Sequence, residues 1–142
     1  MMSVSKYNDK GYPDPTAYEA ICNIEREEKL KGFRPIVFVC SPFKGDLEKN
    51  TRRARRYSRF VVTSGGIPFA PHLLFPQFMD EEDSVQRELG IFFGTVFLRK
   101  CQELWVFGDK ITSGMQIEID KAKTRNILIR YFNERCEEVQ DK

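Results

Sequence analysis

Short apolar runs that alternate with stretches of helical pattern constrain the fold of this chain more than any other feature. Ile36 to Cys40 is a continuous apolar run of strand length, typical of a strand buried on both faces of a parallel sheet. Four strands are expected, at residues 36–40, 67–70, 103–107 and 126–131. Four helices are expected before or between them, at residues 16–32, 47–64, 80–100 and 114–124.

This order predicts an α/β fold, because connections of helical length between strands imply right-handed crossovers and a parallel sheet covered on both sides. We expect a Rossmann or flavodoxin-like three-layer sandwich with a parallel sheet of four to five strands. The length of 142 residues leaves room for one core. Residues 1–14 are polar and broken by Gly and Pro, so we interpret them as a loose arm before a domain over residues 15–142.

Composition argues against several classes of protein. The formal net charge of +2 does not point to nucleic acid or to an anionic membrane, and no apolar stretch is long enough to span a bilayer. Arginines crowd the helix expected at 47–64, but acidic segments elsewhere favour a solvated helix face over nucleic-acid binding. The four cysteines lack zinc spacing, and the chain opens without a signal peptide, which predicts reduced thiols in the cytoplasm.

Ligands of parallel α/β sheets bind beyond the carboxyl ends of the strands, which draws attention to three loops. The loop over residues 41–46 places Ser41 and Lys44 just before a helix. Backbone N–H groups at a helix N-terminus, with a lysine nearby, suit a phosphate or another anion. The alternative is a plain connection in which Ser41 and Asp46 satisfy local backbone groups. The other two loops cover residues 71–78 and 108–114.

Glu118 is the strongest candidate for chemistry. Its spacing from Met115, Ile119 and Ala122 places it on the apolar face of the expected helix, where a solvated glutamate has no reason to be. An ionised carboxylate at the edge of a pocket can act as a nucleophile, as in retaining glycosidases. The alternative is a glutamate at the boundary of the core that pairs with an arginine.

The middle loop contains His72, the only histidine, with Asp80 beyond it. A lone histidine is more often a hydrogen-bonded structural residue than a base, and no Ser-His or Cys-His pairing supports a catalytic triad. No clustered ligands support a metal site either. We therefore expect neither a metal nor an organic cofactor.

Several motifs together resemble small bacterial and phage domains related to nucleoside 2-deoxyribosyltransferases. They extend from residue 36 to about 130 and include SPFKGD, PFAPH, FPQF, ELWVFG and SGM followed by Glu118. The wider superfamily also includes hydrolases of 2′-deoxynucleoside 5′-monophosphates. The resemblance implies that Glu118 attacks the anomeric carbon and displaces the base, and that Asp80, from the middle loop, protonates it.

The resemblance also implies a binding site for a small-molecule nucleotide or nucleoside, with a phosphate cradle in which Lys44 favours a nucleotide. The expected binding residues are Ser41, Phe43, Lys44, Gly45, Asp46, His72, Ser113, Gly114 and Met115. By resemblance such domains assemble as oligomers, and the helix over residues 80–100 is a plausible interface.

This chain departs from the characterised members at two positions. Phe43 occupies the neighbourhood of a tyrosine at the end of the first strand, and Thr112 or Ser113 replaces an aspartate before the glutamate. Both departures favour hydrolysis of a nucleotide N-glycosidic bond over base transfer. The rival interpretations are a module that binds a nucleotide or nucleotide-derived signal without cleaving it, and a structural subunit with a vestigial pocket.

Overall fold

A computed structural model describes residues 19–20, 23 and 32–140 of the chain. The chain divides into two compact units, residues 1–34 and 35–142, and the account below concerns the second. The arm expected at residues 1–14 lies outside the described residues, as does nearly all of the helix expected at 16–32. The domain boundary proposed after residue 14 therefore stays a prediction.

The second unit is built on a five-stranded sheet in the order β2-β1-β3-β4-β5. The first four strands in the chain are β1 (Ile36–Cys40), β2 (Ile67–Phe69), β3 (Glu103–Phe107) and β4 (Leu128–Phe132). They run parallel, as predicted, while the short β5 (Glu138–Val139) pairs with β4 in the antiparallel direction. Because β1 has β2 on one side and β3 on the other, the strand order reverses at β1.

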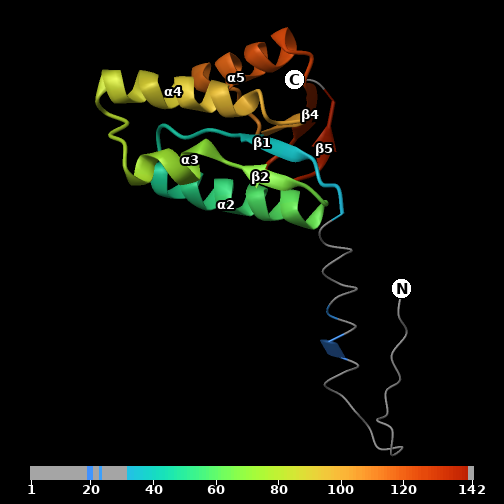
Figure 1. Ribbon diagram of the computed structural model, residues 1–142. Helices are drawn as coiled ribbons and strands as arrows, with labels where there is room; N and C mark the ends of the chain where they lie inside the picture. Colours follow the sequence, from blue (N-terminus) through green and yellow to red (C-terminus); the bar gives the residue numbers. More distant parts are fainter. Residues whose placement is uncertain (1–18, 21–22, 24–31, 141–142) are drawn as a thin grey trace, which may run out of the picture. The chain divides into compact units, whose positions relative to one another are not determined.

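The helices cover both faces of this sheet, with α4 and α5 on one side and α2 and α3 on the other (Figure 1). Their bounds are α2 (Leu47–Thr63), α3 (Pro71–Leu74), α4 (Ser84–Leu98) and α5 (Ser113–Thr124). The predicted three-layer α/β fold is confirmed. Residues 71–78 were expected to form an irregular loop, but they begin with α3 and a 3₁₀ turn at Phe75–Gln77.

Alternating side chains of β1 explain why the sheet needs a helical layer on each face. Phe38 and Cys40 are fully buried on the side of α4 and α5, whereas Val37 and Val39 are buried on the side of α2. Tyr57 of α2 stacks on Phe107 of β3, with ring centroids 4.4 Å apart. Each face of the sheet therefore has its own apolar core.

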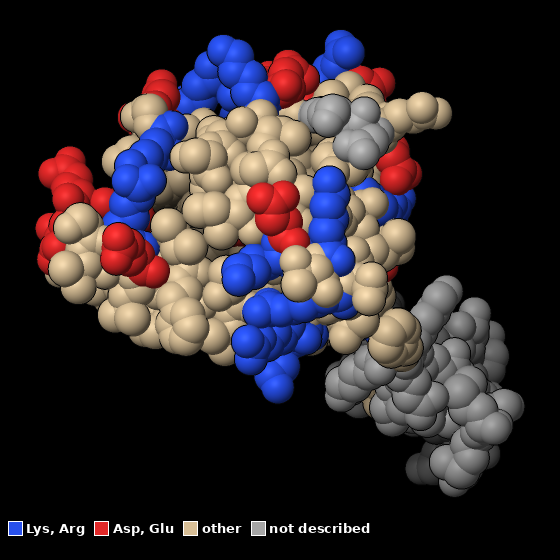
Figure 2. Space-filling model, turned by 90° about the horizontal axis from the view of Figure 1, so that it is seen from above, with Lys and Arg blue, Asp and Glu red and all other residues tan. Residues whose placement is uncertain are grey.

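The outer side of α4 is unusually apolar for a helix at the surface. Its exposed large side chains are Val85, Leu89, Phe92, Val96 and Phe97. Figure 2 views the molecule from above α4 and α5, and on this face broad uncharged areas separate the groups of Lys, Arg, Asp and Glu. None of the helices among the described residues has the length and apolar character needed to cross a membrane.

Candidate functional site

A cavity of about 100 Å³ lies at the carboxyl ends of the central strands. Its walls come from the loops that follow β1 and β3, from α3 and the segment before α4, and from the N-terminal halves of α4 and α5. It therefore occupies the place where strand order reverses, the usual ligand site of an open parallel sheet. The lining residues are Phe43, Lys44, His72, Glu81, Arg87, Ile91, Thr112, Ser113, Gly114, Met115 and Glu118.

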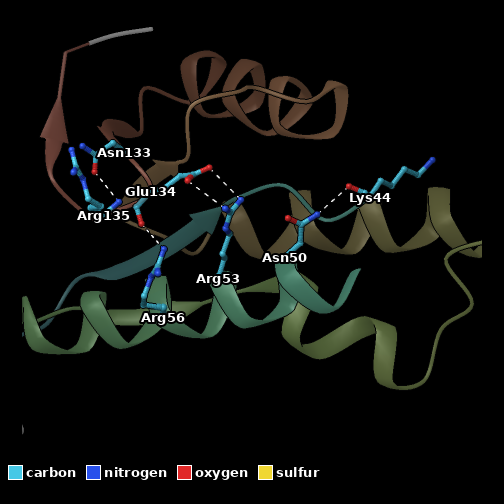
Figure 3. A network of polar contacts seen from close by, with 7 residues as sticks. All are labelled: Lys44, Asn50, Arg53, Arg56, Asn133, Glu134 and Arg135. Atoms are coloured by element: carbon cyan, nitrogen blue, oxygen red, sulfur yellow. Dashed lines mark hydrogen bonds and ion pairs between the residues drawn. The ribbon is translucent and has the colours of Figure 1, made fainter. Parts of the chain in front are cut away.

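The loop between β1 and α2 is held in a defined shape by its own polar groups. Asp46 caps α2 by accepting a hydrogen bond from the Lys49 N–H at 3.0 Å. The buried Asn50 amide donates to the carbonyls of Phe43 at 2.9 Å and Lys44 at 3.0 Å. Figure 3 shows the Lys44 side chain extending away from Asn50. The backbone of Lys44 is thus fixed while its ammonium group stays available to a ligand.

His72 forms one wall of the cavity and has a structural hydrogen bond as well. Its Nε2 lies 3.0 Å from the Ser41 carbonyl oxygen, and its ring stacks on Phe43 with centroids 4.7 Å apart. Burial lowers the pKa of His72 to about 4, although the hydrogen bond with Ser41 acts to raise it. The ring is therefore neutral at pH 7, and its Nε2–H donates to Ser41.

Glu118 lines the same cavity from the second turn of α5, and its Oε1 is buried without a hydrogen-bond partner. Within the part of the chain that the structure describes, no arginine or backbone donor pairs with that oxygen, which argues against the core-boundary alternative. Burial raises the pKa of the carboxyl to about 8, while a hydrogen bond with Cys40 acts to lower it. Such an unpaired polar atom is costly inside a protein and is a common mark of a functional site.

The thiol of Cys40 closes the buried side of the site. It lies at the end of β1, fully buried, with its Sγ 3.8 Å from the Met115 carbonyl oxygen. Burial raises its pKa well above the ordinary value for a thiol, and the neighbouring Glu118 raises it further. Cys40 is therefore a protonated donor beside the carboxyl rather than a nucleophile.

The N-terminus of α5 forms the wall nearest to Glu118. Thr112 caps the helix, its hydroxyl accepting from the Met115 N–H at 3.2 Å. Ser113 and Gly114 follow at the first two helical positions, where backbone N–H groups have no partner within the helix. The positive end of the helix dipole thus lies at the cavity.

Two charged residues of the cavity were not identified from the sequence. Glu81 follows the α3 region, and Arg87 lies on the first turns of α4. Burial raises the pKa of Glu81, whereas the positive charges of Arg87 and Lys44 act to lower it. No local motif distinguishes these residues from surface charges, because Glu81 belongs to an acidic run and Arg87 to an ordinary helix start.

Seven of the residues expected at the site line the cavity: Phe43, Lys44, His72, Ser113, Gly114, Met115 and Glu118. The other four are not among its lining. Ser41 is buried, and its hydroxyl has no hydrogen-bond partner. Gly45, at φ 102°, and Asp46 shape the loop behind Lys44. Asp80 is exposed, and its carboxylate accepts from the Glu82 N–H at 2.9 Å.

Part of the arginine-rich face of α2 has a structural role away from the cavity. Arg53 pairs with the Glu134 carboxylate at 3.2 Å, and Arg56 donates to the Glu134 carbonyl (Figure 3). These contacts stabilise the position of the turn after β4 against α2.

Comparisons with known proteins agree with the fold. The model of a family described as a domain of unknown function (DUF7768) matches residues 35–132. Among solved structures, the 2-deoxyribosyltransferase of the psychrotolerant bacterium Bacillus psychrosaccharolyticus matches with a TM-score of 0.59 at 12% identity. The match covers 74% of this chain and 77% of that one, and it shows a shared fold. No curated protein matches the sequence.

Proposed function

Because the chain belongs to the DUF7768 family, whose description names no activity, we propose its function from the site: it hydrolyses the N-glycosidic bond of a (deoxy)nucleoside 5′-monophosphate. The observation that carries this proposal is the Glu118 carboxyl. It lines a cavity at the point where the strand order reverses, and its buried Oε1 has no hydrogen-bond partner among the described residues. The fold shared with a 2-deoxyribosyltransferase supports a nucleoside-type substrate.

In the proposed reaction, a Glu118 carboxylate oxygen attacks the anomeric carbon of the sugar. The bond from that carbon to the base nitrogen breaks, and the base leaves with the bonding electrons and takes up a proton. Water then attacks the glycosyl-enzyme, releases the sugar phosphate and restores Glu118. Transfer to a second base would follow the same first step, with the base replacing water.

An acid is needed to protonate the leaving base, and two neighbouring carboxyls are candidates. Asp80 is the candidate from the sequence, but its side chain is engaged with the Glu82 backbone. Glu81 lines the cavity, and burial raises its pKa, which suits a group that must hold a proton. We assign the acid role to Glu81, and a comparison of Glu81→Gln with Asp80→Asn tests this choice.

The proposed nucleophile must be ionised, which sets the pH dependence of the reaction. With a pKa of about 8, roughly a tenth of Glu118 is ionised at pH 7. Base release should therefore increase from pH 6 to pH 8, as the carboxyl loses its proton.

The test is release of free base from a panel of ribo- and deoxynucleoside 5′-monophosphates, with and without an acceptor base. Glu118→Gln and Glu118→Ala should each reduce release by about 10³-fold or more, since the covalent step is lost. Arg59→Met, an exposed change on α2, is the control and should leave the rate unchanged. Release that persists in both Glu118 variants would contradict the proposed role of this residue.

The protonation of Glu118 favours one alternative, a module that binds a nucleotide without cleaving it. A protonated carboxyl can donate a hydrogen bond to a ligand and need not react. This alternative predicts that a nucleotide raises the melting temperature while no base is released at any pH between 6 and 9.

A further inference from the structure

The cavity contains two cationic side chains from different elements, Lys44 from the loop after β1 and Arg87 from α4. Among the residues that the structure describes, neither side chain forms an ion pair or a hydrogen bond. Two other half-buried arginines of the unit contrast with this arrangement, since Arg53 and Arg130 have carboxylate partners at 3.2 Å and 2.8 Å.

The half-buried position of Arg87 makes its missing partner informative. An exposed lysine is satisfied by water, but a guanidinium in a cavity wall presents a planar fork of donors that matches the oxygens of a phosphate. The nearby Glu81 carboxyl interacts electrostatically with both cations, so all three charges share one region of the cavity. Even in its ionised form, Glu81 compensates only one of the two positive charges.

The same cavity has two further features that fit an anionic ligand. The first helical positions of α5, Ser113 and Gly114, present backbone N–H groups at the positive end of the helix. The buried Glu118 Oε1 lies on the same helix and has no hydrogen-bond partner among the described residues. This missing partner indicates a binding site without reference to Lys44 and Arg87.

We propose that Arg87 is the specificity-determining residue of this site: with Lys44 it binds the phosphate group of the ligand and selects a phosphomonoester over the uncharged nucleoside. This deepens the proposed function and rests on it only for the identity of the sugar and base. Lys44 supplies a mobile point charge, and Arg87 supplies bidentate hydrogen bonds. Selection for the phosphate therefore depends on both residues, and more strongly on Arg87.

The test measures the dissociation constants of a 2′-deoxynucleoside 5′-monophosphate and of the same nucleoside at one ionic strength, by calorimetry on the full chain. The readout is the dissociation constant of the nucleoside divided by that of the nucleotide, which exceeds one when the site prefers the phosphate. Arg87→Met should reduce this ratio by about 10- to 100-fold, as expected for charge-assisted hydrogen bonds. Lys44→Met should reduce it less. Arg87→Lys, which keeps the charge but loses the fork, should restore part of it.

Two variants serve as controls for this experiment. Arg59→Met removes an exposed arginine of α2 and should leave the ratio unchanged. Glu81→Gln removes a carboxyl that is negative only in its ionised form, so the variant should leave the ratio equal or increase it. A wild-type ratio near one, an Arg87→Met variant that weakens both ligands equally, or a decreased ratio in Glu81→Gln would overturn the proposal.

The outcomes for this proposal and for the proposed function are separable. Nucleotide binding that depends on Arg87, without base release at any pH, would support the phosphate site and exclude glycosidic cleavage. Base release that is equally fast from nucleosides and nucleotides, in wild type and in Arg87→Met, would support cleavage and exclude the phosphate site.

Discussion

The two faces of the sheet differ in how completely their polar groups have partners and their apolar side chains are covered. On the side of α2, large apolar side chains such as Tyr57 and Val61 are buried, and Asn50 and Arg53 have partners. The side of α4 and α5 has a core as well, but there the buried Glu118 oxygen and the Arg87 side chain have no partner among the described residues, and large apolar side chains of α4 lie at the surface. Both sides stabilise the fold through their cores, and only the side of α4 and α5 also leaves polar groups unsatisfied at the cavity, as is expected where a functional site departs from the rules of a stable core.

The largest effect should come from opening the α2 core. Tyr57 is 1% exposed and stacks on Phe107, so Tyr57→Ala should lower the free energy of unfolding by about 3–5 kcal/mol through lost packing and a cavity. Denaturant titration measures this change. Arg59→Ala, on the exposed side of the same helix, is the control and should shift it by less than about 0.5 kcal/mol. A loss below about 1 kcal/mol for Tyr57→Ala would mean that the core on the α2 side contributes little to stability.

Replacing Glu118 should have an intermediate effect that depends on pH. The carboxyl has a pKa of about 8 in the folded protein, above its ordinary value of 4.5, so the unfolded chain loses this proton at lower pH. The raised pKa therefore adds its full contribution to the free energy of unfolding below pH 4.5. This contribution is lost as the pH rises to about 8, by at most about 1.4 kcal/mol per pH unit.

Denaturant titration of wild type and Glu118→Gln at pH 5, 6.5 and 8 measures this dependence. The free energy of unfolding of wild type should fall relative to that of the variant as the pH rises. The difference between the two free energies should therefore change between pH 5 and pH 6.5 and again between pH 6.5 and pH 8. Parallel curves over this range would show that Glu118 ionises normally and that its environment is more polar than described.

The smallest effect on the folded protomer should come from the outer side of α4. Phe92 is 59% exposed, so Phe92→Glu should change the free energy of unfolding of the monomer by less than about 0.5 kcal/mol. We propose that a second copy of the chain covers this apolar surface, because contiguous exposed apolar patches mark interaction sites. Sedimentation velocity should then show a weaker self-association for Phe92→Glu.

Val62 offers a matched control for that experiment, because it is an apolar side chain of α2 that is 41% exposed. Val62→Glu should leave the association unchanged. If wild type is monomeric at all concentrations, or if both variants associate like wild type, α4 is not the interface.

The burial of the central strand was predicted from the sequence. The apolar run at Ile36–Cys40 is typical of a strand covered on both faces, and the structure confirms that side chains of β1 are buried on both. On α2, Ala54, Tyr57 and Val61 recur at helical spacing and are buried. The apolar stripe of α4 has the same kind of pattern, yet Val85 and Phe92 are exposed. Periodicity tells which side chains share a face of a helix, but it does not tell whether the same chain covers that face.

Within the site, local patterns identified the residues that act near a strand end or a helix start. Lys44 was found from its place between a strand end and a helix start, and Glu118 from its spacing on an apolar helix face, whereas Ser113 was expected from the family resemblance. Arg87 and Glu81 were missed, since their role depends on how the segment between β2 and α4 folds over the cavity. Asp80 and Glu81 are adjacent in the chain, and only the fold decided which of them lines the cavity.

The sequence by itself determined the class of fold, the order of its elements and the position of Glu118 on an apolar helix face. These properties depend on the period of apolar residues and on chain connectivity, both of which are local. The tertiary structure decided which charges share a cavity, which polar atoms lost their partners and which apolar surface stayed uncovered. These depend on distances between segments far apart in the chain, such as the 75 residues that separate Cys40 from Met115.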